Sequence, residues 1–567
     1  MSGWLKAALA AALAAVCGGL LWAYTIALRA PAAGTFHDDG IYAVTAQALA
    51  TGRGYRIVSL PSEMPQTKYP FLFPALLAVV WRMFPRFPQN LIWLKLVPLG
   101  CGLIWVAFSY RLLREKTGRV PVSLALTGLM ALSPWVLFLA TALLSETLFA
   151  ALATGALVLF SRMERGRRGW GIVTGAAILA AAAFLTRTAG FAVIGAGAMT
   201  LLVRHRPRQA LVMVLICAAI CAPWIVWQLW QSSDMASYDA YYSQTNYGDW
   251  NILSHFRAAE KARILAQNCL AVLLAPAVLM GMRATGWGSA VAILAGSLVA
   301  AGFIRRLSWR PQATEILVLL YGGLVVCWAW PPSRFLAPLL PLLLMYGYEG
   351  AWALCRALPI PARQARVALA AVALLCGVQG AWTLAVMAAA RGTGAVPVPN
   401  APEDDWHEMA GLLAWLNRNT PPDAVLMGNL DPALYLYTGR KSVRGFVQDP
   451  YQLHYVGGAR PLGSAGDMMS AAERYGARYL VATPSRSFRE GAYLETLTRE
   501  LTEGHPGSFH LAYQSETDAS YRIYAIASVS SGAVLSPKPD FPPAHPLLTS
   551  DYTGSRVSGS REKRGNP

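Results

Sequence analysis

The sequence predicts a polytopic α-helical membrane protein with a small α/β domain near its C-terminal end. Of the 567 residues, 55% are hydrophobic and only 14% are charged, whereas soluble proteins average about 25% charged residues. The apolar residues are gathered into long runs, many of which reach the roughly 20 residues that a membrane-spanning helix needs. After about residue 392 these runs stop and the patterns of a soluble domain begin.

About eleven apolar runs are long enough to cross a bilayer if the neighbouring helices of a bundle are allowed to be short. They are residues 7–28, 91–110, 120–140, 143–160, 170–186, 189–203, 209–230, 286–304, 313–330, 334–351 and 367–389. The first run is longer than the roughly 7–15 apolar residues of a signal peptide, so we expect it to remain as the first transmembrane helix.

The basic residues set the predicted topology. The net charge of +18 comes largely from Lys and Arg in short segments between apolar runs, at 111–119, 161–168, 204–208, 305–310 and 356–366. Eleven crossings from a cytoplasmic N-terminus put all five segments inside, as the positive-inside rule requires. The excess of positive charge is therefore explained by membrane topology, and it gives no reason to expect nucleic-acid binding. Anionic membrane lipids stay possible partners.

Two further apolar runs, 71–84 and 264–282, are placed by the same argument. If either crossed alone, the later basic loops would change sides, so we expect both runs to lie in the interface or to re-enter the membrane, as amphipathic helices do. The outer face then receives the first loop (29–90), the corner at Glu146, the loop 231–263 and everything after about residue 392.

The predicted domains are a transmembrane module (1–391), an extracytoplasmic α/β domain (392–534) and a disordered tail (535–567) rich in Pro, Ser and charge. Within the α/β domain, helical spacing ends at the Pro-Pro break after Thr420, and strands are expected at 478–484 and 520–527. The residues at helical spacing are Trp406, Met409, Leu412, Leu413 and Leu416.

An acidic pair, Asp38 and Asp39, follows the first apolar run in the stretch TFHDDGIY. An Asp ahead of a helix caps free backbone N–H groups, but one Asp suffices for that. Adjacent carboxylates repel each other, which raises one pKa toward the range of a general base. The residues alone leave both a helix cap and a catalytic role open.

Four more charged residues stand at the outer ends of apolar runs: Lys68, Glu146, Arg187 and Arg334. Lys68 could snorkel to the interface or bind a lipid phosphate. A Glu146 side chain that faced lipid would cost a few kcal/mol, so we expect it to face the bundle. There it could contact a donor sugar, pair with Arg187, or interact favourably with the dipole of the helix that it begins. The two arginines could anchor helix ends, form buried pairs or bind phosphate.

The outer loop 231–263 is rich in Tyr, Asn, Ser and Asp, a composition that suits either sugar binding or an interfacial aromatic belt. Asp239, Asp249 and His255 are its candidate contributors. His37 could join the acidic pair in a metal site, but the local spacing is poor for one ion, so no metal is predicted.

The chain resembles the GT-C glycosyltransferases, near the family 39 group of protein O-mannosyltransferases and aminoarabinose transferases. The resemblance covers most of the chain and rests on the order of several short motifs. These are Asp38-Asp39-Gly40-Ile41-Tyr42, Gly54-Tyr55, Lys68-Tyr69-Pro70, Leu144-Ser145-Glu146-Thr147-Leu148, Leu185-Thr186-Arg187 with Gly190, Pro223-Trp224, Arg334-Phe335 ahead of residues 338–341, and PDAVLMGN with LYLYTGRKSV near the C-terminal end.

The resemblance implies an enzyme of the bacterial cytoplasmic membrane that moves a hexosyl or pentosyl group from a polyprenyl-phosphate donor to an acceptor at the outer face, with inversion. It implies Asp38 as the general base, with Asp39 standing where the family usually has Glu. No cofactor is implied, and the acceptor is a lipid, a glycan or a protein. The implied donor contacts are Lys68, Arg187, Arg334, Glu146 and Tyr42, and the weaker acceptor or sugar contacts are Tyr55, Asp249 and His255.

Two other classes of function remain as alternatives. A transporter or flippase of lipid-linked sugars would favour inverted repeats and charges near the bilayer midplane, whereas this sequence has no evident repeat and gathers its charges at the outer rim. A membrane-anchored binding protein would need far fewer helices than eleven.

Overall fold

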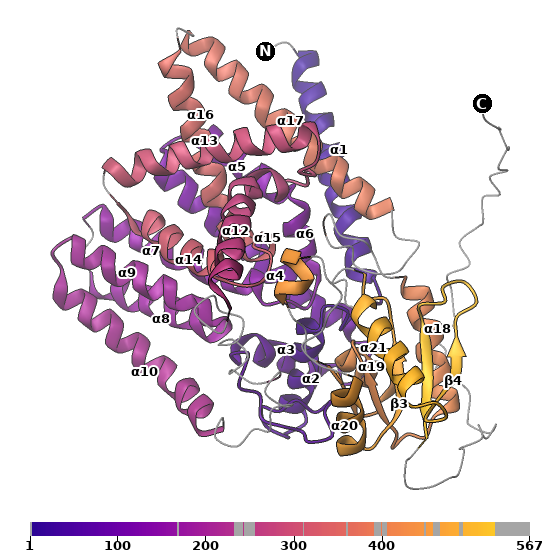
Figure 1. The fold of residues 1–567 in the computed structure, drawn as a ribbon. Coiled ribbons are helices and arrows are strands. Elements are labelled where there is room, and N and C mark those ends of the chain that lie inside the picture. The colour runs from indigo at the N-terminus through magenta and orange to yellow at the C-terminus, as the bar shows by residue number, and fades with distance from the viewer. Residues whose placement is uncertain are drawn as a thin grey trace, which may run out of the picture.

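The computed structural model describes residues 3–166, 169–231, 242, 256–309, 311–358, 361–389, 399, 405–446, 450–456, 465–486 and 491–527. The predicted disordered tail lies outside these residues. Figure 1 shows a large group of helices on one side, a smaller sheet-containing unit on the other, and helices α2 and α3 near the boundary between them.

The large group, which we call the bundle, is built from apolar helices. They are α1 (Gly3–Arg29), α2 (Asp38–Ala50), α3 (Leu72–Met83), α4 (Leu91–Thr117), α5 (Val120–Ala131), α6 (Pro134–Thr141), α7 (Glu146–Glu164), α8 (Trp170–Thr186), α9 (Phe191–Val203), α10 (Pro207–Gln231), α12 (Ala258–Val278), α13 (Trp287–Trp309), α14 (Ala313–Val326), α15 (Ser333–Leu336), α16 (Leu340–Ala357) and α17 (Ala362–Ala389), with short 3₁₀ turns η1 (Thr188–Gly190) and η3 (Ala337–Leu339). Among the described residues, six helices are long and apolar enough to cross a membrane, or seven if one bent pair counts as a span. The chain is thus a multi-pass helical protein, and the predicted number of eleven crossings is not confirmed.

Several predicted crossings are interrupted by proline. The run 120–140 forms α5 and α6, which meet at 60°, because Pro134 begins a new helix at its first position instead of continuing the old one. The run 334–351 divides into α15, η3 and α16, with Pro338 and Pro341 at the first turns of the last two. Each of these two apolar runs, predicted as one crossing, is therefore divided between shorter helices.

The two runs that were predicted to lie in the interface differ from each other. The run 71–84 forms α3, whose 12 residues are too few to span about 30 Å of hydrocarbon. The run 264–282 belongs to α12, which begins earlier, at Ala258, and has 21 residues. By length and composition α12 is able to cross a membrane, because the charged residues of its first turns extend the helix beyond the apolar run. Its interfacial or re-entrant position stays a prediction.

Charged residues mark the two ends of the bundle. Helix α7 carries Glu146 at one end and Glu164 at the other, about 27 Å apart at 1.5 Å per residue. The Nζ of Lys116 lies 2.8 Å from Glu164, an Arg306 nitrogen donates to the Lys116 carbonyl at 3.3 Å, and Arg204 donates to the Glu164 carbonyl at 3.3 Å. Four segments that were predicted to share the inner side therefore do meet at one end.

The sheet unit begins with α18 (Trp406–Asn419) and contains one five-stranded sheet of order β2-β1-β3-β5-β4. Strands β1, β2 and β3 are parallel, whereas β4 and β5 are antiparallel. Its other elements are β1 (Val425–Gly428), α19 (Asp431–Thr438), β2 (Ser442–Val443), η5 (Gln452–Val456), α20 (Ala465–Tyr475), β3 (Ala477–Ala482), α21 (Gly491–Gly504), β4 (Phe509–Gln514) and β5 (Arg522–Ile526). The predicted helix before the Pro-Pro break and both predicted strands are confirmed, and the five residues of that helix that were singled out for their helical spacing are buried.

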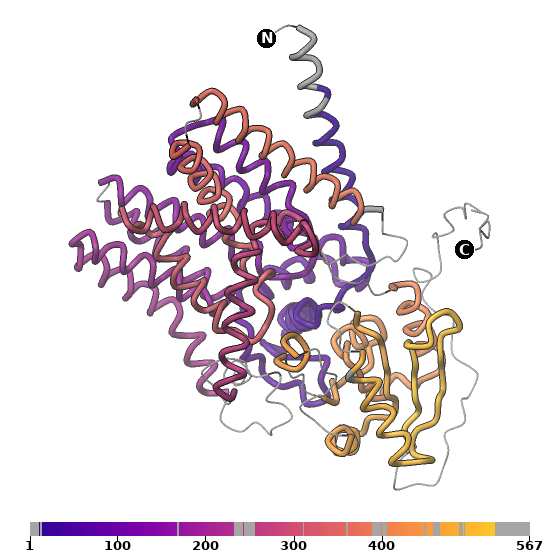
Figure 2. Tube along the Cα trace, turned by 45° about the horizontal axis from the view of Figure 1, so that its top comes forward, coloured from indigo at the N-terminus to yellow at the C-terminus, as the bar shows by residue number. Residues whose placement is uncertain are grey.

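The sheet unit shares its core with the first loop. Ile57, Val58 and Leu60 of that loop are buried in one cluster with Val443 and Phe446. Two hydrogen bonds reinforce this contact: the Ser442 N–H donates to Ser59 at 2.9 Å, and Lys441 donates to the Val58 carbonyl at 2.6 Å. Figures 1 and 2 both show the indigo helices beside the orange sheet unit.

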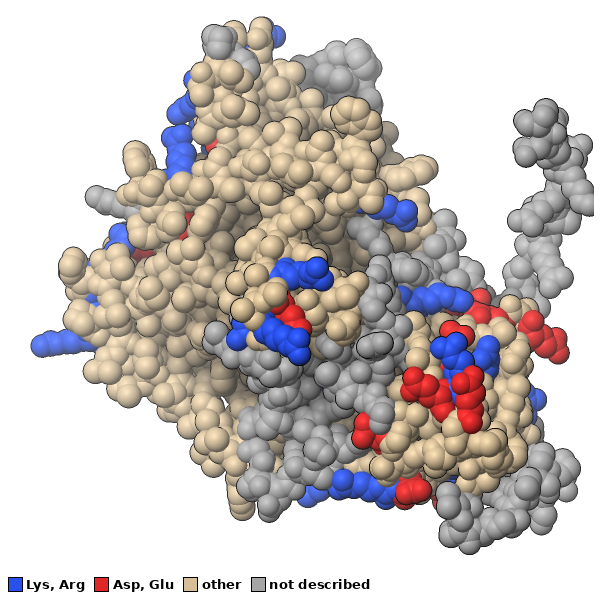
Figure 3. Space-filling model, in the orientation of Figure 1, with Lys and Arg blue, Asp and Glu red and all other residues tan. Residues whose placement is uncertain are grey.

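The distribution of charge also separates the two parts. In Figure 3 charged side chains gather over the sheet unit, while wide areas over the helices carry none. Large apolar side chains are exposed on the helices, among them Trp287 and Trp309, each 90% exposed at the two ends of α13. Exposed tryptophans at both ends of a long apolar helix are typical of membrane interfaces.

Helices α13 and α16 pack so closely that one glycine position is restricted. A Cβ on Gly302 would lie 2.0 Å from the carbonyl oxygen of Tyr346. Gly302→Val should force the two helices apart and lower the thermal unfolding temperature of the purified chain in detergent. Gly322→Val is the matched control, because a Cβ there meets nothing within 4 Å. Equal unfolding temperatures for both variants would contradict this packing.

Candidate active site

Asp38 and Asp39 are the first two residues of α2, and they have different surroundings. The Asp39 carboxylate accepts hydrogen bonds from the backbone N–H groups of Gly34 (2.7 Å) and Phe36 (2.9 Å), and the residue is only 3% exposed. Burial raises the pKa of Asp39 to about 6, although these backbone bonds oppose the shift. Asp39 therefore closes the turn ahead of α2.

Asp38 is the more open of the two acids, with a side chain 25% exposed. One carboxylate oxygen lies 2.9 Å from the Arg334 guanidinium, and the other accepts a hydrogen bond from the Tyr69 hydroxyl at 2.5 Å. Burial raises the pKa of Asp38, but the charge of Arg334, the Tyr69 hydrogen bond and the charge of Lys68 outweigh it, so the pKa is lowered. Asp38 is therefore ionised at neutral pH.

Glu146 joins two arginines at the start of α7. One of its carboxylate oxygens lies 2.5 Å from Nε of Arg334 and 2.9 Å from Nη1 of Arg187. The Glu146 side chain is 1% exposed, whereas those of the arginines are 17% and 16% exposed. Of the three alternatives for Glu146, the structure shows the pairing with Arg187, and it adds Arg334 as a second partner that also reaches Asp38.

A chain of hydrogen bonds continues from this cluster to α2. Arg187 donates to the Ser145 hydroxyl at 3.1 Å, and that hydroxyl lies 3.0 Å from the Tyr42 hydroxyl. Tyr42 is 2% exposed. Tyr42 is therefore linked to Arg187 through the Ser145 hydroxyl, one turn along α2 from the acidic pair.

Lys68 lies in a turn that several side chains hold. The side-chain oxygen Oε1 of Gln66 accepts from the N–H groups of Lys68 (2.7 Å) and Tyr69 (3.2 Å). The Tyr55 hydroxyl donates to the Tyr69 carbonyl at 2.8 Å, and Gln228 of α10 donates to the Thr67 carbonyl at 2.8 Å. The geometry of Tyr55 makes it a support of this turn.

The Lys68 amine belongs to the same electrostatic cluster as Asp38. Its Nζ lies 5.6 Å from the centre of the Tyr69 ring, and the residue is 3% exposed. Burial lowers the pKa of Lys68 to about 7, while Asp38 raises it and Arg444 of the sheet unit lowers it further. The site thus combines one open carboxylate with several cations at the same end of the bundle.

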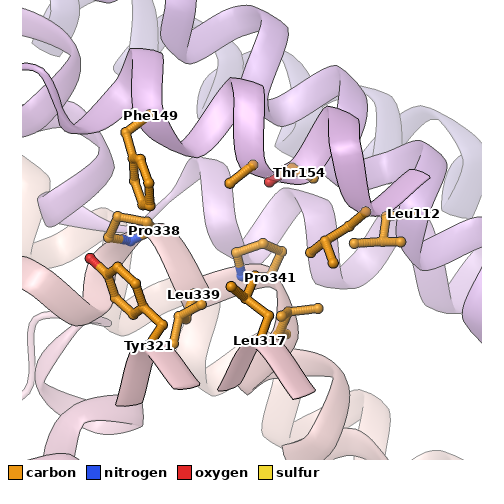
Figure 4. A pocket seen from close by; sticks show the side chains of 11 residues that line it. Leu112, Phe149, Thr154, Leu317, Tyr321, Pro338, Leu339 and Pro341 are labelled. Atoms are coloured by element: carbon orange, nitrogen blue, oxygen red, sulfur yellow. The ribbon is translucent and has the colours of Figure 1, made fainter. Parts of the chain in front are cut away.

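The turn that carries Arg334 is packed on an apolar floor. The Tyr321 hydroxyl donates to the Phe335 carbonyl at 2.8 Å, which fixes this turn to α14. Beneath it, Phe149, Tyr321 and Pro338 line a small cavity (Figure 4) of about 10 Å³, roughly the space of one water molecule. The cavity is too small for a lipid chain, so it serves as packing.

The structure also reports on the other sequence-predicted residues. Asp239, Asp249 and His255 lie outside the described residues. The ring nitrogen Nε2 of His37 lies 3.2 Å from a carboxylate oxygen of Asp431 in the sheet unit. The described residues contain no group of three or more His, Cys, Asp or Glu arranged as a metal site.

Three contributors escaped the sequence analysis: Tyr69, Ser145 and Asp431. Tyr69 and Ser145 lie directly beside Lys68 and Glu146 in the motifs given above. This proximity was the one feature of the sequence that could have indicated their contribution. Asp431 carries no signal in its local sequence, because its partner His37 is nearly 400 residues away.

The fold is similar to that of two solved structures, an ArnT and an oligosaccharyltransferase. ArnT from Cupriavidus metallidurans, bound to undecaprenyl phosphate, superposes with a TM-score of 0.56 over 92% of this chain and 99% of that chain at 12% identity. The Archaeoglobus fulgidus oligosaccharyltransferase in complex with Zn and sulfate gives a TM-score of 0.51 over 90% of this chain and 73% of that chain at 14% identity. No family model and no curated protein sequence matches the chain.

Removing the charge of Glu146 should destabilise the protein strongly. Glu146→Gln leaves two partly buried arginines short of a counter-charge, and breaking a buried ion pair costs about 3–5 kcal/mol. Chemical or thermal unfolding in detergent measures the loss. Glu63→Gln is the control, because Glu63 pairs with Arg53 and Lys441 with its side chain 31% exposed, and such pairs contribute about 0–1 kcal/mol. Equal losses would show that Glu146 is not essential to the cluster.

Proposed function

We propose that the chain is a glycosyltransferase that moves a sugar from a polyprenyl-phosphate donor to an acceptor at the outer face of the bacterial cytoplasmic membrane. One observation carries the proposal: an open, ionised carboxylate, Asp38, lies beside Arg334 at the same end of an apolar bundle as Lys68 and Arg187. A fold shared with ArnT, which binds undecaprenyl phosphate, supports it.

The proposed reaction uses the two kinds of charge in different ways. An acceptor hydroxyl oxygen attacks the anomeric carbon of the sugar, and its proton passes to the Asp38 carboxylate. The bond between the anomeric carbon and the phosphate oxygen breaks, and the bond electrons leave with the polyprenyl phosphate. Attack from the face opposite the phosphate inverts the anomeric centre. Lys68, Arg187 and Arg334 lie where they balance the phosphate charge, and a donor phosphate that draws Arg334 away from Asp38 would make that carboxylate more basic.

Asp38 is favoured over Asp39 as the base. Both Asp39 oxygens accept backbone hydrogen bonds inside the turn, whereas Asp38 has the more exposed carboxylate. Tyr42 and Glu146 are assigned to positioning Arg187 and Arg334 by their contacts. Tyr55 is assigned to the turn that carries Lys68.

The position of the cluster supports an enzyme over a flippase. A transporter of lipid-linked sugars would favour charges near the midplane of the bundle. Here the cluster around Glu146 lies at one end of α7 and the pair of Lys116 with Glu164 at the other, a separation of about 27 Å. A donor phosphate held at a bilayer surface would reach the first of these ends.

Asp38→Asn should abolish transfer while it leaves donor binding intact. The amide cannot accept the proton, so kcat should fall by about 10²–10⁴-fold. Transfer is measured by mass spectrometry, with a panel of undecaprenyl-phosphate sugars as donors and an extract of membranes from cells that lack the chain as the source of acceptor. Binding is measured separately with undecaprenyl phosphate. Asp423→Asn, at a side chain 73% exposed, is the control. A folded Asp38→Asn variant with normal turnover would refute the proposal.

Transfer should depend on pH through Lys68. Its amine has a pKa of about 7, so its positive charge is present below pH 7 and is lost as the pH rises through 7. The value of kcat/KM for the donor should fall over this range, because kcat/KM reports groups of the free enzyme. Lys68→Arg keeps the charge at every pH tested and should remove this decline. A decline of the same size in Lys68→Arg would exclude Lys68 as its source.

A further inference from the structure

The residue before Asp38 has a strained backbone. His37 has φ 58° and ψ −56°, and the Asp38 N–H donates to the Phe36 carbonyl at 2.6 Å. These values describe a three-residue γ-turn of the rare positive-φ form, which L-residues avoid. Such a conformation persists only when the surrounding structure holds it. Because the turn leads directly into Asp38, it sets the direction of that carboxylate.

The sheet unit supplies one of the groups that hold this turn. The His37 Nε2 atom lies 3.2 Å from Oδ1 of Asp431, and the Tyr242 hydroxyl donates to Oδ2 of Asp431 at 2.8 Å. Asp431 is fully buried and is the first residue of α19. One carboxylate therefore joins the turn before Asp38 to the segment between α10 and α12.

Helix α19 is itself fixed against the first loop. A Cβ on Gly40 would lie 2.6 Å from the Pro432 Cβ, so the Pro432 side chain packs directly on the Gly40 backbone. The Tyr437 hydroxyl donates to the Pro31 carbonyl at 2.5 Å. These contacts lie on both sides of the turn, so Asp431 stands on an element that cannot move independently of it.

We propose that Asp431 is a positioning residue for sugar transfer: through His37 it holds the γ-turn that aims the Asp38 carboxylate. This role rests on the proposed function of Asp38. The sheet unit is then part of the catalytic apparatus, because it completes the support of the turn from outside the bundle. The remaining support of the turn comes from the hydrogen bonds that the Gly34 and Phe36 N–H groups donate to Asp39.

The test compares Asp431→Ala, Asp431→Asn and the control Asp423→Asn in the full chain in lipid nanodiscs. Hydrogen exchange of the amides of residues 34–40 reports the turn without any need for activity. Asp431→Ala should speed this exchange by about tenfold and lower kcat on the order of 10²-fold. The KM for the undecaprenyl-phosphate sugar that the wild type consumes fastest should change little, because the cations remain in place. Asp431→Asn keeps an oxygen toward Tyr242 and should fall between the wild type and Asp431→Ala.

The result has three informative alternatives. Unchanged exchange in Asp431→Ala overturns the proposal, because the turn then needs no support from the sheet unit. Faster exchange with an unchanged kcat per folded molecule also overturns it, since Asp431 would then be merely structural. A wild-type chain that transfers no sugar refutes the proposed function instead, and the exchange data then decide alone whether Asp431 holds the turn.

Discussion

The carboxylate of Glu146 meets two arginines at the start of α7, with only 1% of its side chain exposed. A buried charge without a partner costs several kcal/mol, so the ends of α7 and α8 and the turn with Arg334 must stay together. Arg334 then extends this constraint to Asp38 in the first loop. The arrangement of the site follows from the need to satisfy one buried acid.

The same electrostatic rule shapes the ends of the bundle. Charges are costly inside an apolar environment, and in the described part of the chain the ion pairs of α7 gather at its two ends. The distance between these ends, about 27 Å, is close to the thickness of a bilayer core. The cluster around Glu146 therefore lies at an end of this helix and not near its middle.

The sheet unit is more than an appended domain, because it shares an apolar cluster with the first loop. One backbone hydrogen bond, from Ser442 to Ser59, and the amine of Lys441 just before β2, which donates to Val58, attach this strand to the first loop. The first loop is therefore enclosed between the bundle and the sheet unit. This enclosure explains how a loop can carry a strained turn beside an ionised acid.

The sequence by itself determined the elements whose causes are local. Apolar length gave the helices, the spacing from Trp406 to Leu416 gave α18, and the acids and cations at the ends of apolar runs identified Asp38, Lys68, Glu146, Arg187 and Arg334. The tertiary structure alone decided how these residues pair, because Glu146 and Arg334 are 188 residues apart and periodicity records only near neighbours. It also decided the contact of Asp431 with His37, since this contact depends on packing between distant segments.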